Sequence, residues 1–129
     1  MRVYNKWHSI IKKELKKMNL THPQFVVLAS LAYLSQNGNE ITQIMISKLA
    51  GIDVMTVSQI LNLLEKNDFV KRKEHSRDTR AKAVILNKKG EEVLQKAVPL
   101  VEQIDEIFFE KLDTDEEQFK HFLARLNEE

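Results

Sequence analysis

The side chains best suited to binding chemistry in this sequence are the lysines and arginines of residues 68–90, which read DFVKRKEHSRDTRAKAVILNKKG. Residues 71–90 hold eight basic side chains and only two acidic ones. Such a charge density suits a polyanion, because lysines and arginines release the counterions condensed on it. A solvated surface on which charges cluster by chance is the alternative. Since the whole chain has a net charge of only +1, the basic character is local.

The pattern around these cations predicts a two-stranded ribbon. Residues 69–73 form an extended run, residues 74–79 are rich in turn-forming types, and residues 80–86 form a second extended run. Asn87 and Gly90 then mark the start of another element. The basic side chains are therefore expected to project from a hairpin.

A polar helix face precedes the ribbon. Residues 54–67 carry apolar side chains at the spacing of one buried helix face, namely Val57, Ile60, Leu61 and Leu64. The opposite face offers uncharged hydrogen-bonding groups on Thr56, Ser58, Gln59 and Asn62. Such groups can bond to base edges in the major groove of DNA, where Gln or Asn pairs with adenine through two bonds. An ordinary solvated face is the alternative for this helix taken alone.

The residues before this helix predict a helix-turn-helix. Thr42 is expected to cap a short helix, in which Ile46 and Leu49 point inward. A tight connection follows, and Asp53 can cap the helix over residues 54–67. That longer helix is then the second helix of the motif.

Two further helices are predicted at the start of the chain. Residues 2–18 carry one apolar stripe with lysines beside it, which predicts an amphipathic first helix. Thr21 and Gln24 have the spacing of a capping box, and Pro23 falls in the first turn, where its missing N–H is harmless. The dense apolar run at residues 25–34 predicts a central, largely buried second helix.

A long helix is predicted after the ribbon. Asn87 can cap it, its apolar stripe continues to residue 112, and Pro99 should kink it. Thr114 and Glu117 form another capping box before a short final helix. The apolar stripes of the first and last helices exceed what a thin core can cover, so we expect them to pair with a second copy in a homodimer.

The composition removes several classes of protein. The 129 residues, of which 43% are apolar, fit one compact unit. The sequence has no apolar run of 18 residues and no secretory leader pattern, so no membrane partner and a cytoplasmic location are expected. It has no cysteine, three glycines and four scattered histidines. We therefore expect no enzyme, no catalytic site, no metal site and no cofactor.

The order of these elements and four stretches of sequence resemble the MarR (multiple antibiotic resistance regulator) family of winged helix-turn-helix regulators. The stretches are LTHPQFVVLASLA at 20–32, ISKLAGID at 46–53, TVSQILNLLEKNDFVKR at 56–72 and DTRAKAVILNKKG at 78–90. The resemblance covers nearly the whole chain, and its most specific part is the Asp-x-Arg beside the second strand of the ribbon, the wing of the family.

The resemblance implies a fold class and a division of the chain. The fold is expected to be mainly α with a small antiparallel β-wing at residues 70–86. Residues 1–129 would form one unit. Within it, residues 21–90 would be the winged helix-turn-helix lobe, and residues 1–20 and 91–129 would be the dimerisation helices.

The resemblance also implies a sequence-specific regulator of double-stranded DNA, expected to be a ligand-responsive repressor. The helix over residues 54–67 would lie in the major groove and the wing in the adjacent minor groove. The expected DNA-binding residues are Thr42, Gln43, Thr56, Ser58, Gln59, Asn62, Arg72, Arg77, Asp78, Arg80 and Lys82. The two-fold symmetry of a homodimer implies a palindromic operator with half-sites one helical turn, ~10 bp, apart.

Arg80 would be the wing arginine that enters the minor groove, and Asp78 would orient it. A guanidinium held by a carboxylate keeps its direction, and a narrow A·T-rich minor groove attracts it. The alternative for this pair is a local ion pair that stabilises the turn. Two departures from the family matter: Asp68 stands where members often have glycine, and Gln59 and Leu63 stand where many carry a basic residue. The wing is therefore expected to contribute more of the affinity.

Two questions about binding partners remain open at this point. A winged-helix module that binds a protein or single-stranded nucleic acid is the alternative function, although the ribbon has few aromatic side chains for unpaired bases to stack on. The family also implies a possible small-molecule effector in a cleft between the dimer helices and the DNA-binding lobe. Trp7, Phe25 and Phe108 are candidate wall residues of that pocket, with ordinary core packing as the alternative for each.

Overall fold

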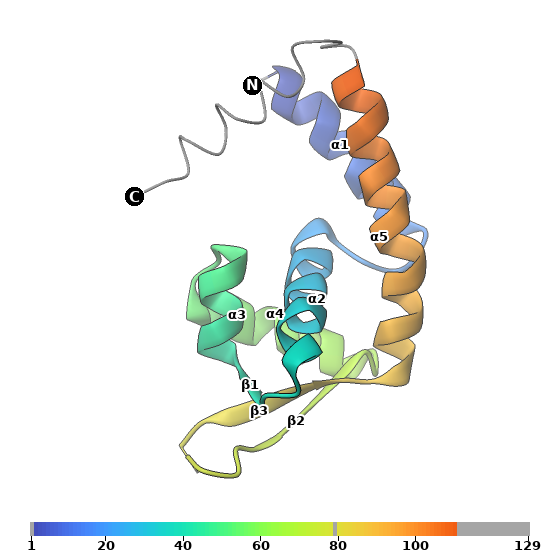
Figure 1. Ribbon diagram of the computed structural model, residues 1–129. Coiled ribbons are helices and arrows are strands. Elements are labelled where there is room, and N and C mark those ends of the chain that lie inside the picture. The colour runs from blue at the N-terminus through green and yellow to red at the C-terminus, as the bar shows by residue number, and fades with distance from the viewer. Residues whose placement is uncertain (1, 79, 111–129) are drawn as a thin grey trace.

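The computed structural model describes residues 2–78 and 80–110 of the chain. The helices in this part are α1 (Arg2–Lys16), α2 (His22–Leu34), α3 (Gln43–Ala50), α4 (Val54–Lys66) and α5 (Lys88–Phe109), with a 3-10 turn, η1 (Ser35–Asn37). The strands are β1 (Ile41–Thr42), β2 (Val70–Glu74) and β3 (Lys82–Leu86). The predicted fold class, mainly α with a small antiparallel sheet, is confirmed (Figure 1).

Helix α2 lies at the centre of the fold and begins at the predicted capping box. The Thr21 hydroxyl accepts the Gln24 N–H at 3.2 Å, and the Gln24 side chain accepts the Thr21 N–H at 3.1 Å. Because these bonds satisfy N–H groups that lack helical partners, the helix starts at a defined residue. Val27, Leu28 and Leu31 are fully buried, and the helix is largely buried, as expected from the sequence.

Helices α3 and α4 form the predicted helix-turn-helix and meet at a bend of 110°. The Thr42 hydroxyl caps α3, and the Asp53 carboxylate caps α4 by accepting the Thr56 N–H at 2.9 Å. Ile46 is fully buried, as predicted. The prediction for Leu49 is wrong, since this side chain is 47% exposed. We attribute the difference to the shortness of α3, whose last turn diverges from the core at the bend.

The wing belongs to a three-stranded antiparallel sheet with the strand order β1-β3-β2. β2 and β3 pair from Val70 opposite Leu86 to Glu74 opposite Lys82. The predicted two-stranded ribbon is therefore incomplete, because β1 also pairs with β3. β1 is two residues long, too short for a periodic signal in the sequence, and it forms because β3 offers a free edge beside it.

The junction between the sheet and α5 is closely packed. Asp68, with a φ of 66°, ends the α4 segment in the left-handed conformation, which Asp tolerates better than most residues. Asn87 occupies the predicted N-cap position of α5, but its side chain makes no capping hydrogen bond, since its amide donates to the Asp68 carbonyl at 3.2 Å. The left-handed conformation at Asp68 turns the backbone so that its carbonyl lies within reach of the Asn87 side chain.

Helix α1 lies beside the half of α5 that is far from the sheet (Figure 1). Ile11 and Leu15 of α1 are fully buried, and the Trp7 indole N–H donates to the Asp105 carboxylate at 2.7 Å. The short helix predicted after Thr114 lies outside the described residues. Within the described part no single helix has the length and apolarity to cross a membrane, and the bent pair α3 and α4 meets those criteria only when both are taken together.

Candidate nucleic-acid interface

A cleft of about 600 Å³ lies between the start of α3, α4 and the wing. Its lining residues are Thr42, Gln43, Ile44, Val54, Ser58, Arg72, Asp78, Arg80, Ala81 and Lys82. Seven of the predicted DNA-binding residues are thus brought together, although the chain separates them by up to 40 positions. Thr56, Gln59, Asn62 and Arg77 are not among the lining residues. The cleft presents hydroxyl, amide and cationic groups on one concave surface.

The turn of the wing is organised by the ring of His75. Its Nδ1 atom accepts the backbone N–H groups of Arg77 and Asp78, each at 3.1 Å. Because Nδ1 accepts these bonds, the ring proton lies on Nε2. The His75 N–H in turn donates to the Ala81 carbonyl at 3.2 Å across the turn. The backbone at the tip is therefore shaped by a side chain of the wing itself.

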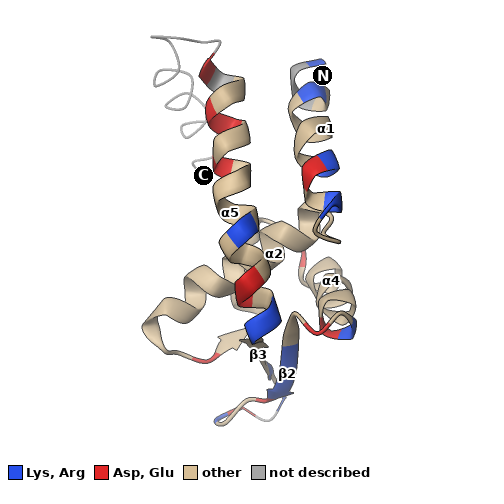
Figure 2. Cartoon of the chain, turned by 90° about the vertical axis from the view of Figure 1, so that its right-hand side faces the viewer, with Lys and Arg blue, Asp and Glu red and all other residues tan. Residues whose placement is uncertain are grey.

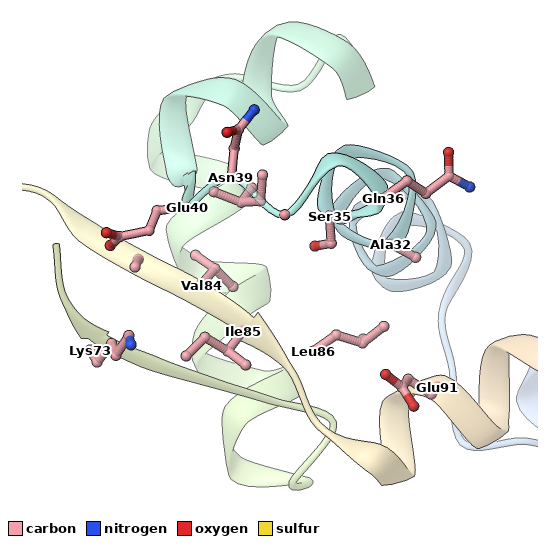
Figure 3. A pocket seen from close by; sticks show the side chains of 13 residues that line it. Ala32, Ser35, Gln36, Asn39, Glu40, Lys73, Val84, Ile85, Leu86 and Glu91 are labelled. Atoms are coloured by element: carbon pink, nitrogen blue, oxygen red, sulfur yellow. The ribbon is translucent and has the colours of Figure 1, made fainter. Parts of the chain in front are cut away.

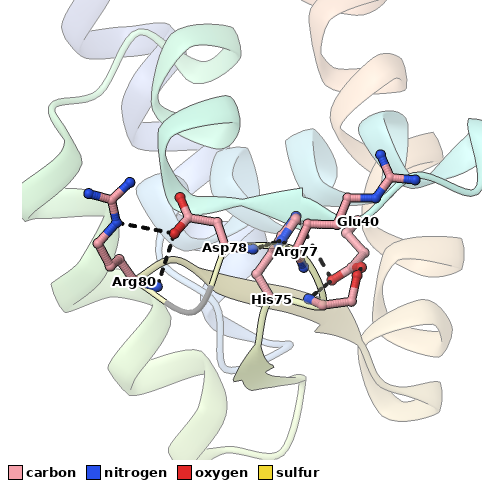
Figure 4. Close-up of polar contacts among 6 residues, drawn as sticks. Glu40, His75, Arg77, Asp78 and Arg80 are labelled. Atoms are coloured by element: carbon pink, nitrogen blue, oxygen red, sulfur yellow. Dashed lines mark hydrogen bonds and ion pairs between the residues drawn. The ribbon is translucent and has the colours of Figure 1, made fainter.

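Glu40, in the loop before β1, ties this turn to the body of the protein (Figure 4). Its carboxylate accepts the Ser76 N–H at 3.1 Å and the Ser76 hydroxyl, and it lies 3.9 Å from Nε2 of His75. The hydrogen bonds from Ser76 hold the pKa of Glu40 below its usual range, with His75 and Lys73 contributing in the same direction. The wing tip is thus attached through an ionised carboxylate.

This attachment should respond to acid. The folded-state pKa of Glu40 is lowered, so its contribution is present above the ordinary carboxyl range and is lost as the pH falls through the lowered value. In Glu40→Gln we expect the Ser76 amide proton to lose protection at neutral pH, where protection is its exchange rate compared with that of an unstructured amide at the same pH. In the wild type we expect the same loss of protection on acidification. Amide exchange measured by NMR tests this, with Glu74→Gln on the wing as the matched control. Equal protection of Ser76 in both variants would contradict the role of Glu40.

Asp78 and Arg80 form the pair expected from the sequence. The Asp78 carboxylate accepts the Arg80 backbone N–H at 3.1 Å and the Nε–H of the Arg80 side chain at 3.3 Å (Figure 4). The Arg80 side chain is 91% exposed, so the ion pair contributes little to stability. The carboxylate does, however, hold the guanidinium at the edge of the cleft.

The polar face of α4 is only partly free. The Thr56 hydroxyl donates to the Asp53 carboxylate at 2.7 Å, so it takes part in the helix cap, whereas Gln59 is exposed. Sequence reasoning missed the apolar side chains beside these groups. Ile44 is 55% exposed and Met55 is 75% exposed at the start of the two helices of the motif. Apolar side chains this exposed can contact thymine methyl groups.

Arg72 differs most from its expected position. Only 13% of its side chain is exposed, and its guanidinium donates to the side-chain oxygens of Gln43, Asn62 and Glu65. The hydrogen bond from Arg72 holds the pKa of Glu65 below its usual range. Arg72 therefore joins β2 to α3 and α4 and is not a freely exposed cation.

The charges of the described residues are segregated along the molecule. Figure 2 shows Lys and Arg on β2, at the end of α4, at the start of α5 and along α1, and acidic residues along the far half of α5. A further cavity of about 510 Å³ lies where the end of α2 faces β3, with Ala32 and Ser35 across from Val84 and Leu86 (Figure 3). It contains none of the predicted site residues.

None of the cavities described here is lined by Trp7, Phe25 or Phe108, the three residues predicted to line an effector pocket. Phe25 is 9% exposed within the core, Phe108 is half-buried on α5, and Trp7 packs edge-on against His22 with ring centroids 5.7 Å apart. A pocket of about 430 Å³ lies between α1 and the start of α2. Its lining residues are His8, Lys12, Lys16, Leu20, Thr21, His22 and Pro23.

Comparisons with known proteins agree with this geometry. The family model described as the ArnR1-like winged-helix domain matches residues 16–104. YdcH, an uncharacterized HTH-type transcriptional regulator of Bacillus subtilis (strain 168), is 35% identical over 103 residues, which cover 80% of this chain and 70% of the relative. A MarR mutant from E. coli complexed with operator DNA has a TM-score of 0.86 at 22% identity, covering 98% of this chain and 89% of that chain.

A second solved structure is BpsR of Bordetella bronchiseptica, described for the regulation of its DNA binding by 6-hydroxynicotinic acid. It has a TM-score of 0.82 at 26% identity, covering 96% of this chain and 86% of that chain. The bent helix pair, the small sheet and the projecting wing define a winged helix-turn-helix DNA-binding protein. The chain belongs to the ArnR1-like winged-helix domain family, and it is a transcriptional regulator with the fold of the MarR structure rather than an enzyme.

Proposed function

We propose that this regulator is a repressor that binds a palindromic operator as a homodimer, with α4 in the major groove and the wing in the adjacent minor groove. The observation that carries the proposal is the cleft between α4 and the wing. When one element lies in each groove, the phosphate strand that separates the grooves must pass between the two elements. The donors and cations that line the cleft suit the oxygens of such a strand.

The position of the exposed aromatics favours duplex DNA over a single strand. Stacking of unpaired bases requires aromatic faces beside the basic surface. Phe69, next to the wing, is 4% exposed, and Tyr33, which is 63% exposed, lies on α2 and does not line the cleft. The cleft therefore offers charge and hydrogen bonds without a stacking platform among the described residues.

The test is a selection of bound duplexes from a random pool, followed by titration of the selected site and of each of its separate strands at moderate salt. We expect a two-fold symmetric site that binds at least about 10³-fold more tightly than unrelated duplex. The affinity should fall with added salt by a slope of about 0.9 for each neutralised phosphate. Equal affinity for a separate strand and for the duplex would refute the proposal in favour of the single-strand alternative.

The dimer is proposed from the apolar surface of the terminal helices. Ile10 of α1 is 38% exposed and Ile107 of α5 is 58% exposed, on the two helices that extend away from the DNA-binding cleft. A second copy would cover them and would place two wings and two α4 helices on one face. Analytical ultracentrifugation of the operator complex should find two chains for each duplex.

Regulation by a small anion is proposed from the pocket between α1 and α2. Lys12 and Lys16 give it positive charge, and His22 lies in its wall. Burial lowers the pKa of His22 below its ordinary value, and His8 lowers it further, whereas Asp105 raises it. The compound named for BpsR, 6-hydroxynicotinic acid, is an aromatic carboxylate of the kind that such a pocket suits.

An aromatic carboxylate should therefore weaken operator binding, and more strongly at lower pH. An anion beside His22 stabilises the imidazolium, so the anion binds more tightly as the pH falls through the pKa of His22. Titration of 6-hydroxynicotinic, nicotinic and benzoic acids into the operator complex tests this, with the His22 ring signals followed by NMR. In Lys16→Ala the response should be lost, and in Lys96→Ala on α5 it should persist. Unmoved His22 signals with all three acids would contradict the site.

A further inference from the structure

The side chain of Arg72 occupies the space between the wing and both helices of the helix-turn-helix. One terminal nitrogen donates to Oε1 of Gln43 at 3.0 Å, and the other donates to Oδ1 of Asn62 and to Oε1 of Glu65, the latter at 3.1 Å. The Arg72 backbone N–H also donates to Oε2 of Glu65 at 3.0 Å. Both oxygens of Glu65 are thus used, and the guanidinium is held from several sides.

The chemistry of this contact fixes the direction of two amide groups. A guanidinium carries N–H donors, has no acceptor and stays charged at any pH at which the protein folds. An amide that faces it must therefore present its oxygen, because the reversed amide would place N–H against N–H. The usual ambiguity between the oxygen and the nitrogen of an amide is removed here by the partner. The NH₂ groups of Gln43 and Asn62 consequently point away from Arg72.

We propose that Arg72 is a positioning residue for DNA recognition, which turns Gln43 and Asn62 so that both present N–H donors to the DNA. The inference rests on the proposed function, and it adds that these two amides donate hydrogen bonds to the DNA and do not accept them. Gln43 lines the cleft between α4 and the wing, and Asn62 is exposed on α4, so both NH₂ groups lie on the surface proposed for DNA.

This polarity selects the partners on the DNA. Phosphate oxygens, N7 of purines, O6 of guanine and O4 of thymine accept hydrogen bonds, whereas the amino groups of adenine and cytosine donate them. Two-bond pairing with adenine requires the amide oxygen to accept from the adenine amino group. Because Arg72 holds that oxygen in both residues, Gln43 and Asn62 are assigned to acceptors. The adenine pairing anticipated for Asn62 from its residue type is replaced by contact with an acceptor.

The charge of Arg72 and its orienting role can be separated by substitution. Arg72→Lys keeps the positive charge next to Glu65, but an ammonium group lacks the planar fork that holds two amides. The side chain of Glu65 is 40% exposed, so water can solvate it in Arg72→Lys, and the fold should persist. Arg72→Lys should bind the operator about fivefold more weakly with an unchanged salt slope.

A double-mutant cycle tests the coupling. Asn62→Ala should also cost about fivefold, and the variant that combines it with Arg72→Lys should be no weaker than either single variant. Gln59 is the matched control, since it is an exposed amide of α4 outside the Arg72 contacts. The losses caused by Gln59→Ala and Arg72→Lys should multiply. A cycle in which the losses from Asn62→Ala and Arg72→Lys also multiply would overturn the proposal.

Modified operators test the polarity itself. Replacing single phosphates by methylphosphonates, or purines by their 7-deaza forms, removes acceptors one at a time. We expect wild-type binding to weaken at particular positions, and Arg72→Lys and Asn62→Ala to be insensitive at the same positions. Replacing adenine by purine removes the amino group instead. A loss in the wild type on that replacement, absent in Asn62→Ala, would show that the amide oxygen is read and would refute the assignment.

A measurement without DNA separates this inference from the proposed function. In the free protein, Arg72→Lys should shift the side-chain NH₂ signals of Gln43 and Asn62 in NMR spectra and leave those of Gln59 unchanged. Unshifted Gln43 and Asn62 signals would refute the orienting contact, but they would not contradict the proposed binding to duplex DNA. A wild-type protein that shifts as expected and binds no duplex would instead refute the proposed function, and the role of Arg72 in recognition with it.

Discussion

Arg80→Ala should weaken operator binding at least about tenfold, which corresponds to ~1.4 kcal/mol. The reason is the position of Arg80 at the edge of the cleft, where the Asp78 carboxylate fixes its direction. A guanidinium oriented before binding loses little side-chain entropy when it enters a narrow minor groove. Fluorescence anisotropy with the selected operator measures the loss. Because the side chain is 91% exposed, thermal unfolding should be unchanged.

Three further variants test whether the loss of affinity comes from the directed Arg80 guanidinium. Arg80→Lys retains the charge and should recover only part of the affinity, since an ammonium group lacks the planar fork. Asp78→Asn should weaken binding less than Arg80→Ala, because the guanidinium remains but is less well directed. Lys96→Ala, on α5 and away from the cleft, removes one charge and should bind as the wild type does. An Arg80→Ala protein with wild-type affinity would be incompatible with the proposed role of the wing.

Gly90→Ala should destabilise the folded protein by about 3 kcal/mol, toward the upper end of what overpacking costs. A Cβ atom at this position would lie 2.3 Å from the Phe69 carbonyl oxygen and 2.8 Å from Cδ1 of Leu86. The carbonyl belongs to the backbone and already accepts the Asn87 N–H at 3.0 Å, so it cannot move without breaking that bond. Urea denaturation followed by circular dichroism measures the change.

The matched control is the same substitution at a glycine without a steric neighbour. Gly38 has a φ of 74°, and no atom lies within 4 Å of the position that a Cβ atom would take there. Gly38→Ala should therefore destabilise the folded protein by about 1 kcal/mol, because of the left-handed backbone alone. The difference between the two variants isolates the close approach of α5 to the chain at Phe69. Equal destabilisation by Gly90→Ala and Gly38→Ala would show that α5 and the backbone at Phe69 can move apart to admit a methyl group.

The local elements of the protein are predictable from the sequence because their signals lie within a few residues. The capping box of Thr21 and Gln24, the Asp53 cap and the buried face of α4 all follow from spacings of three or four positions. The left-handed closure at Asp68 is likewise a local property. These features define a winged helix-turn-helix with a basic wing, since helix periods and caps act before any tertiary contact forms.

The structure differs from the sequence-based expectations where a neighbour distant in the chain intervened. The strand β1 has only two residues and exists because β3 lies next to it. Leu49 fits the helical period of α3, yet the bend to α4 turns it outward. Asn87 has a capping residue type, but its side chain finds the reversed backbone at Asp68 instead. In each case the sequence pattern was compatible with the expected contact, and a neighbour distant in the chain decided the outcome.

The lysines, arginines and amides of the candidate interface were recognisable as residue types from the sequence alone, and so was the Asp78–Arg80 pair two positions apart. Only the tertiary structure decided what each of them does. Glu40 reaches Ser76 across 36 positions, and Arg72 reaches Gln43 across 29. Contacts of such separation leave no periodic trace, because they depend on how the sheet is set against the helices. They determine which cations stay exposed for DNA and which ones orient their neighbours.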